Sequence, residues 1–214
     1  MTNLTTLLTL SDSRLPTGGH VHSGGMEEAV SSGLVVDLST LTAFLRRRIV
    51  TTGLVTASLA AAVHRGALSA AAGGSGDLET DARTPSPAAR RASRAQGRGL
   101  LRLARRVWPA REWSDLGATP HLSVAAGSVG AAAGLTAHQT ALSVVYTTMT
   151  NSATAAQRLL ALDPGDVAAL TFTLASVCER TASVAAEGLA DLSDPLLDVL
   201  AERHLERDRP LFAS

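Results

Sequence analysis

The sequence predicts an all-α fold, a single-domain helical bundle of about eight to ten helices over residues 1–214. Hydrophobic residues make up 45% of the chain but aromatic residues only 3%, so an Ala/Leu-rich core is expected. Ala and Leu have high intrinsic helix propensities, and Ala lets helices approach one another closely. No segment alternates apolar and polar residues persistently, as a half-exposed β-strand would.

Four helices are expected before residue 70. In residues 4–8, leucines recur at i, i+3 and i+4, which predicts a short helix. Glu27 stands at the start of the next helix, where the helix dipole favours negative charge. Asp37 is the expected N-cap of a third helix, which ends in the arginines 46–48, and residues 55–63 are expected to form a fourth.

The middle of the chain is expected to hold a flexible loop and then a long helix. The loop is predicted over residues 71–77, which are rich in glycine and serine. Pro87 suits the first turn of a helix over residues 88–107. Gly97 and Gly99 on that helix predict a close crossing with a neighbour, because glycine has no side chain in the way.

The second half of the chain repeats one helix-start signal. Asp163 precedes Pro164, and Asp194 precedes Pro195, so each pair combines an N-cap residue with a proline at the first helical position. Further helices are therefore expected over residues 120–133, 136–160, 164–189 and from 195 to about 207.

Residues 11–28 are the most distinctive stretch, with two Gly-Gly pairs, a proline and two histidines between helix-like segments. Glycine adopts positive φ at no steric cost, and proline fixes φ near −65°. We therefore expect a loop with a defined path, which brings the backbone close to a helix, a ligand or a partner. Asp12 is expected to cap the turn at its start.

His20 and His22 are the candidate metal ligands in this loop. They alternate around Val21, so they point the same way if the loop is extended. Two imidazoles can bind nickel, copper or zinc, but two ligands are too few for a tight site in one chain. A twofold dimer could supply four ligands, and the alternative is that both histidines pack within the loop. We therefore predict no tight metal site.

The long central helix carries a dense group of arginines within 17 residues, namely Arg90, Arg91, Arg94, Arg98, Arg102, Arg105 and Arg106. Spacings of three, four and seven place most of them on one broad face. That face can dock onto an acidic protein, contact nucleic-acid phosphates, or remain solvated and pair with acidic helices of the same chain. A pI near 7 and the lack of interleaved aromatic residues argue against nucleic acid.

The charge of the chain is polarised although its net charge is zero. Residues 1–111 contain 14 arginines against 7 acidic residues, and residues 112–214 contain 5 arginines against 12. This polarity suits a protein that contacts partners with different faces, or one whose own halves pair.

Several function classes are excluded by missing residues. The chain has no lysine, which rules out P-loop phosphate binding and Schiff-base chemistry. Its one cysteine, Cys178, rules out an internal disulfide and fits a reducing compartment. No G-x-S-x-G motif marks a hydrolase, and no apolar run reaches about 18 residues, so a cytoplasmic protein without a membrane span is expected.

Three motifs, spread from residue 7 to residue 214, carry a family resemblance. The first is Leu7-Leu8-Thr9-Leu10-Ser11-Asp12-Ser13, Leu15-Pro16-Thr17-Gly18-Gly19, His22-Ser23-Gly24-Gly25 and Glu27. The second is Ser93-Arg94-Ala95-Gln96-Gly97-Arg98-Gly99-Leu100-Leu101-Arg102-Leu103. The third is His204 and Glu206, followed by Arg209-Pro210-Leu211-Phe212-Ala213-Ser214. These motifs resemble the urease accessory protein UreF family.

The resemblance implies a non-enzymatic, homodimeric, all-α scaffold for nickel insertion into urease. The implied partners are the accessory protein UreD (also called UreH), the GTPase UreG and the urease apoprotein, with neither nucleic acid nor membrane. No tightly bound cofactor is implied, because the assembled complex handles the nickel. The apolar C-terminal tail, residues 208–214, is expected to dock onto a partner and to fold on contact. The partner-binding candidates are Asp12, Pro16, Gly18, Gly19, His22, Ser23, Gly24, Gly25, Glu27, Arg94, Arg98, Arg102, Arg209, Leu211, Phe212 and Ser214.

Two other functions remain open at the level of sequence. One is a helical regulator that binds nucleic acid through the arginine-rich helix. The other is a metallochaperone that itself holds nickel through His20 and His22. Salt-dependent binding to random duplex DNA would favour the first, and equimolar nickel binding by the purified chain would favour the second.

Overall fold

The computed structural model describes residues 4–12, 15, 22–191, 194–208 and 210–212. It confirms the predicted all-α fold, and none of the described residues belongs to a β-strand. No helix in these ranges combines the length and the apolar character needed to cross a membrane. The helices are α1 (Leu4–Leu10), α2 (Met26–Ser31), α3 (Leu38–Arg48), the π-helix η2 (Ile49–Gly53), α4 (Leu54–His64), α5 (Ser75–Ala82), α6 (Pro87–Val107), the 3-10 helix η3 (Ser114–Leu116), α7 (Leu122–Ala132), α8 (Ala137–Leu160), α9 (Pro164–Glu187) and α10 (Pro195–His204).

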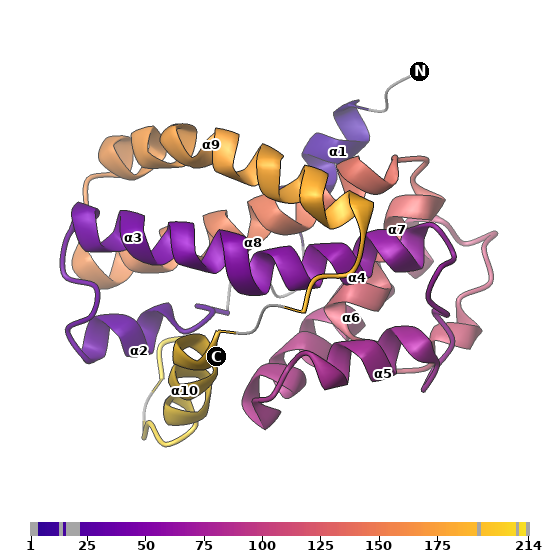
Figure 1. Cartoon of the computed structure of the whole chain (residues 1–214), viewed down its shortest axis with the longest axis horizontal. Coiled ribbons are helices and arrows are strands. Elements are labelled where there is room, and N and C mark those ends of the chain that lie inside the picture. Colours follow the sequence, from indigo (N-terminus) through magenta and orange to yellow (C-terminus); the bar gives the residue numbers. More distant parts are fainter. Residues whose placement is uncertain (1–3, 13–14, 16–21, 192–193, 209, 213–214) are drawn as a thin grey trace.

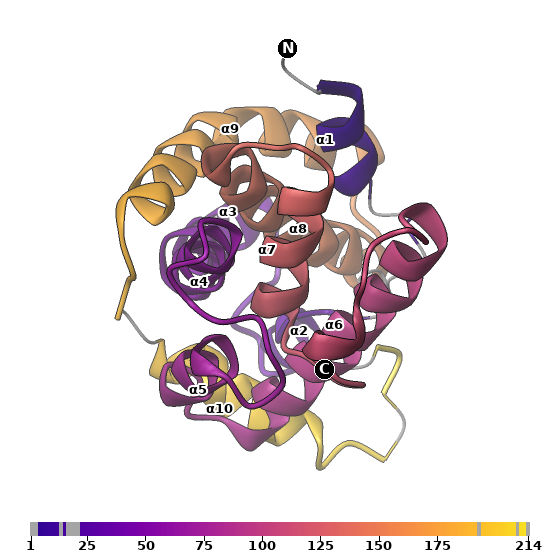
Figure 2. The same cartoon turned by 90° about the vertical axis from the view of Figure 1, so that its right-hand side faces the viewer.

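Helix α4 lies at the centre of the molecule. It continues α3 through η2, so that the three segments form one helical rod along the long axis (Figure 1). Helix α9 runs beside this rod and α8 lies behind it, whereas α5, α6 and α10 lie on the opposite side (Figure 1). Figure 2 looks along the rod and shows α4 end-on, with α9, α7, α8 and α5 around it. The contacts of α4 with all four of these helices agree with that view.

Small residues allow this close packing. Ala57, Ala60 and Ala61 of α4 are completely buried. A Cβ atom added to Gly127 of α7 would lie 2.5 Å from the carbonyl oxygen of Ala60. A Cβ atom added to Gly97 of α6 would lie 2.1 Å from the carbonyl oxygen of Pro120, which confirms the predicted close crossing at this position. The backbones therefore touch where no side chain larger than hydrogen would fit.

The rod contains one irregular turn that local sequence signals did not reveal. Separate helices were predicted on either side of Gly53, but the chain stays helical through the π-turn of η2. A Cβ atom at Gly53 would lie 3.1 Å from the carbonyl oxygen of Arg48, so glycine relieves crowding inside this wider turn. Such turns often occur at functional sites, and this one follows directly after Arg47 and Arg48.

The predicted helix starts are confirmed by their capping contacts. Asp37 accepts a hydrogen bond from the backbone N–H of Thr40 at 2.8 Å, and the Thr40 hydroxyl completes a capping box. Asp163 accepts the N–H groups of two residues in the first turn of α9. Asp194 accepts the N–H group of Leu196 at 3.1 Å at the start of α10. Because each contact spans two or three residues, the local sequence was sufficient to predict it.

The loop predicted over residues 71–77 is wrong in its second half, because helix α5 begins at Ser75. Asp77 is buried and accepts the N–H group of Gly73 at 3.1 Å, which ties the preceding turn to the helix. A Cβ atom at Gly76 would lie 2.7 Å from the carbonyl oxygen of Ser69. Tertiary contacts thus stabilise a helix where glycine and serine disfavour one locally.

We predict that Gly97→Ala destabilises the protein, although alanine is the better helix former by about 1 kcal/mol. The new methyl group must displace the backbone at Pro120, and overpacking of this kind costs about 1–3 kcal/mol. Thermal and denaturant unfolding measure the loss. Gly188→Ala is the matched control, because a Cβ atom there meets nothing within 4 Å. Equal stability of the two variants would contradict the close crossing.

Candidate functional site

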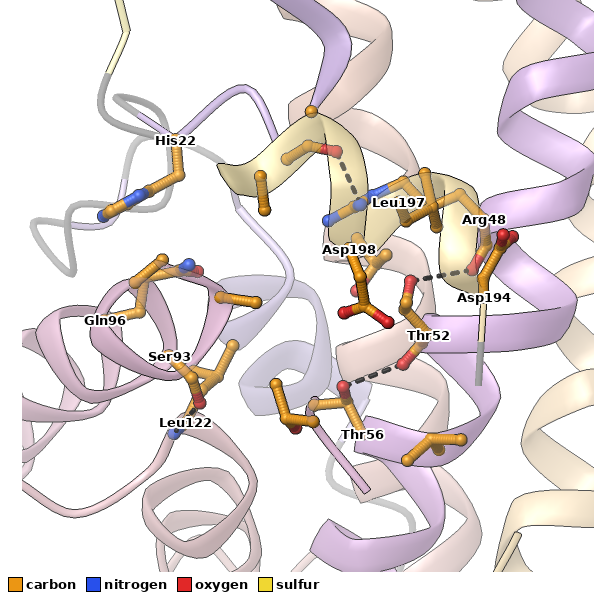
Figure 3. Close-up of a pocket in the computed structure, with 18 of the residues that line it drawn as sticks. His22, Arg48, Thr52, Thr56, Ser93, Gln96, Leu122, Asp194, Leu197 and Asp198 are labelled. Atoms are coloured by element: carbon orange, nitrogen blue, oxygen red, sulfur yellow. Dashed lines mark hydrogen bonds between the residues drawn. The ribbon is translucent and has the colours of Figure 1, made fainter. Parts of the chain in front are cut away.

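Two neighbouring cavities lie where the described ends of the glycine-rich stretch meet the helices. The main cavity, of about 170 Å³, is lined by residues of α4, α6, α8 and α10 and by His22, Gly24 and Gly25 (Figure 3). The second cavity, of about 80 Å³, is lined by Asp12 and Leu15 among others. The two cavities share four wall residues, which are Gln96, Leu122, Thr147 and Asn151. Leu15 and His22, the described residues on either side of that stretch, therefore line adjacent cavities.

The structure brings four of the predicted loop candidates to these cavities, namely Asp12, His22, Gly24 and Gly25. Pro16, Gly18, Gly19 and His20 lie outside the described residues. The described residues contain no group of three or more His, Cys, Asp or Glu side chains placed to hold a metal ion. The prediction about His20 and His22 as metal ligands therefore remains untested.

Gly24 and Gly25 adopt the positive φ angles that the sequence predicted for this loop, +62° and +86°. A second reason also requires glycine at position 24, because the guanidinium group of Arg48 packs against this residue. A Cβ atom at Gly24 would lie 2.3 Å from Arg48 Nη2 and 2.5 Å from its Cζ. Arg48 Nη1 also donates a hydrogen bond to the Gly24 carbonyl oxygen at 2.6 Å.

Two adjacent arginines at the end of α3 point to different partners, and local sequence signals assigned a site role to neither. Arg47 holds Asp194 with both Nε and Nη2, at 2.6 Å and 2.7 Å. Although burial raises the pKa of Asp194, the bonds from Arg47 outweigh it and leave that pKa below its ordinary value. No described carboxylate forms an ion pair with Arg48, and burial lowers its pKa to about 10 although the charge of Asp194 acts in the opposite direction. Arg47 therefore binds a carboxylate directly, whereas Arg48 interacts with the same carboxylate only beyond ion-pair distance.

The carboxylate of Glu27 binds the C-terminal tail. Its side chain is 2% exposed and accepts the backbone N–H groups of Leu211 at 2.8 Å and Phe212 at 3.1 Å. His204 Nε2 lies 3.0 Å from the Phe212 carbonyl oxygen and donates to it. Ser23, also buried, accepts the Glu27 N–H group at 3.3 Å and thereby orders the start of α2. Glu27 thus has an intramolecular role that its position in the sequence motif did not reveal.

The prediction that Phe212 needs a partner for burial is wrong. Phe212 is only 8% exposed and packs in the main hydrophobic cluster of its own chain. Leu211 is 78% exposed, as expected of a docking residue. Arg209 and Ser214 lie outside the described residues. Burial alternates between neighbours because the tail lies along the surface, with one side chain facing in and the next facing out.

Polar contacts hold the C-terminal arm, which we define as residues 194–212, against the rest of the molecule. Arg207 Nη1 donates to Glu28 Oε2 at 3.0 Å. Glu202 Oε1 accepts the Ala88 N–H group at 2.9 Å and the Ser86 hydroxyl, and so caps the start of α6. Together with the Arg47–Asp194 pair, these contacts join the arm to α2, α3 and α6.

The three arginines predicted to dock onto a partner do not behave alike. Arg94 pairs with Asp81 at 3.1 Å and Asp77 at 3.5 Å, and donates to the Thr119 carbonyl oxygen at 3.0 Å. It therefore joins α6 to its own neighbours, which corrects its assignment to a free docking face. Arg98 and Arg102 are exposed, as are three further arginines of this helix, Arg91, Arg105 and Arg106.

A buried histidine connects α5, α6 and α7 beside the main cavity. His121 is 0% exposed, with Nε2 2.9 Å from Asp81 Oδ1 and Nδ1 3.0 Å from Ser93 Oγ. Burial and the charge of Arg94 lower its pKa more than Asp81 raises it, so the ring is neutral. Nε2 then donates to Asp81, and Nδ1 accepts from Ser93.

We predict that this histidine makes stability depend on pH. Because the folded-state pKa of His121 lies below its ordinary value of 6.5, the unfolded chain binds a proton more readily. The contribution of His121 to the free energy of unfolding is therefore fully present above pH 6.5. It is lost as the pH drops through 6.5 toward the folded-state pKa. Thermal unfolding between pH 8 and pH 5 measures this loss.

The variant His121→Gln should flatten this pH dependence. His64 also has a pKa lowered by burial, so His64→Gln is the matched control and should remove a different part of the slope. An unchanged slope in His121→Gln would contradict the assignment. Asp81, whose pKa is also lowered, changes the stability in a separate pH range, near and below pH 3.8.

Comparison of the sequence with known proteins places this chain in a family. A family model described as UreF matches residues 35–175. The urease accessory protein UreF of Mycolicibacterium vanbaalenii is 79% identical over 214 residues, which cover the whole of both chains. Proteins of the same name from Mycobacterium sp. (strain JLS) and Mycobacterium marinum are 74% and 70% identical, again over both whole chains. The chain belongs to the UreF family of urease accessory proteins.

Proposed function

We propose that this chain is a non-catalytic scaffold in urease maturation. It holds a UreD/UreH-type accessory protein and the GTPase UreG together, so that the assembled complex inserts nickel into the urease apoprotein. Its relationship to urease accessory proteins over the whole length supports the general role. The observation that carries the scaffold proposal is the exposed Leu211 on an arm that the chain itself holds in place.

The C-terminal arm is the proposed surface for the UreD/UreH-type partner. Glu27 holds the backbone at Leu211, so this apolar side chain is presented to solvent in an ordered position. An ordered apolar side chain loses less conformational freedom on docking than one in a flexible tail. Leu205, at the end of α10, is 51% exposed and lies on the same arm.

The exposed arginines of α6 are the proposed surface for an acidic partner. Arg98 and Arg102 lie one helical turn apart, and no ion pair with a described residue occupies either side chain. Their charge is therefore available to steer and orient an acidic surface. We propose that the scaffold works as a homodimer, which would present each of these surfaces twice.

Nickel is proposed to be handled by the assembled complex rather than held tightly by this chain. Equimolar nickel binding to the purified chain, lost when His20 and His22 are both replaced, would favour a metallochaperone instead. Salt-dependent binding to random duplex DNA would favour a nucleic-acid regulator. The first test of the scaffold is a pull-down from a urease-positive extract, in which a GTPase and urease subunits should accompany the chain.

We predict that Leu211→Asp abolishes co-purification of the UreD/UreH-type partner. Because Leu211 is 78% exposed, its replacement should change the free energy of unfolding by less than about 0.5 kcal/mol. Leu78→Asp is the matched control, since Leu78 is 63% exposed and belongs to α5, outside the C-terminal arm. Retention of the partner by Leu211→Asp would refute the proposed surface. Phe212→Ala is not a clean test, because emptying a core position costs about 3–5 kcal/mol.

A second prediction separates docking arginines from structural ones. The double variant Arg98→Ala, Arg102→Ala should weaken assembly in a salt-sensitive way, with little change in melting temperature. Arg94→Ala should lower stability by about 1–3 kcal/mol, because Asp77 would lose its cation while buried. Co-purification at several salt concentrations and thermal unfolding measure the two effects. Arg180→Ala, on the exposed face of α9, is the control, and an equal loss of assembly there would contradict a specific docking face.

A further inference from the structure

Two neighbouring arginines use the same edge of the guanidinium group differently. Arg47 grips the carboxylate of Asp194 through Nε and Nη2, the paired donors that match two carboxylate oxygens. Among the described residues, the guanidinium of Arg48 donates from Nη1 alone, to the carbonyl oxygen of Gly24. Its Nε is shielded from solvent and has no hydrogen-bond partner in the described part of the chain. The carboxylate-binding edge that is filled in Arg47 is therefore unused in Arg48.

The surroundings of Arg48 hold this edge in position. One face of the guanidinium lies against Gly24, where a Cβ atom would be 3.0 Å or less from Nη2, Cζ and Nε. The side chain as a whole is partly buried, and its Nε is shielded from solvent. Burial lowers the pKa of the guanidinium group to about 10, although the charge of Asp194 acts in the opposite direction. A donor shielded from water is costly unless it is hydrogen-bonded, so the orphaned Nε–H is the kind of group that a ligand anion satisfies.

No described carboxylate is placed to fill the edge. Asp194 is already engaged by Arg47, Thr51 and the Leu196 N–H group. Asp198 is a second carboxyl group on the cavity wall, but no ion pair joins it to Arg48. Burial, and the charges of Asp194 and Glu202, raise the pKa of Asp198, so it takes up a proton more easily than an ordinary aspartate when another anion enters.

The main cavity, which Arg48 lines, offers space and further donors (Figure 3). Its volume of about 170 Å³ exceeds that of a small carboxylate with its bound water. The half-buried amides of Gln96 and Asn151 also line this cavity, Gln96 on the side away from Arg48 (Figure 3), and each carries two N–H donors. The hydroxyl groups of Thr52 and Thr148 already donate to carbonyl oxygens of their own helices, so the donors for a carboxylate are Arg48 and the two amides.

We propose that the Nε/Nη2 edge of Arg48 is the receptor for a carboxylate ligand that enters the main cavity. The ligand is either a small free carboxylate or an acidic side chain from a protein partner, because both present the same two oxygens. The arrangement repeats the Arg47–Asp194 pair one residue along the helix, with the carboxylate supplied from outside. This inference stands on the chain alone and does not rest on the proposed scaffold role.

The test follows the Nε–H resonances of the full-length, 15N-labelled protein during titration with sodium formate, against sodium chloride at equal ionic strength. One resonance, absent from Arg48→Lys, should shift in a saturable way with formate only. Arg48→Gln should bind formate at least about tenfold more weakly, because the paired donors are gone. Arg46→Gln is the matched control, since Arg46 is exposed two residues away on α3, and it should bind as the wild type does.

The outcomes separate the possibilities even if a variant folds poorly, because the wild-type resonance is read directly. No saturable shift in the wild type would mean that water alone fills the edge and would overturn the proposal, as would equal binding by Arg48→Gln and the wild type. Repeating the titration on the complex with a protein partner identifies the source. A response that persists indicates a free carboxylate, whereas a resonance already shifted and unresponsive to formate indicates a carboxylate from the partner.

Discussion

Close contact between small residues at the centre of the molecule sets how closely the neighbouring helices α5, α7, α8 and α9 pack around α4. Where α7 crosses α4, the backbone at Gly127 lies against the backbone of Ala60, and no space is left for a Cβ atom between them. A core with 3% aromatic residues has few large groups to fill gaps, so stability depends on short distances between helices. The same constraint recurs at the site, where Gly24 lets the guanidinium of Arg48 approach the loop backbone.

Tight apolar packing of the central helices leaves the outer elements to be positioned by polar contacts. Glu27 binds two backbone N–H groups of the tail, Arg47 binds Asp194, and Glu202 caps the start of α6. Each contact is directional, so together they specify one placement of the C-terminal arm. Hydrogen bonds to charged groups contribute about 1.5–3 kcal/mol each, which is enough for a few of them to hold a short arm.

Side chains of the same chemical type therefore have different roles in this protein, some inside the fold and some on the surface. Arg94 is used internally and Arg98 is presented to solvent, just as Phe212 is buried and Leu211 is exposed. The proposed docking surfaces need both kinds of residue, because a surface can bind a partner only if other side chains hold it in shape. Arg48 belongs to neither group, since it is partly buried and its shielded Nε has no hydrogen-bond partner among the described residues.

The sequence by itself determined the features that act over a few residues. Caps such as Asp37, the positive φ of Gly24 and the helical periodicity all depend on neighbours within about one turn, and motifs spread along the chain were sufficient for the family. Only the tertiary structure decided the start of α5, the π-turn after Arg48 and the burial of Phe212. Glu27 and Phe212 meet across 185 positions, and no local pattern encodes which distant backbone a carboxylate will reach. The partners of the charged groups follow from helix packing, which sums weak contacts over the whole chain.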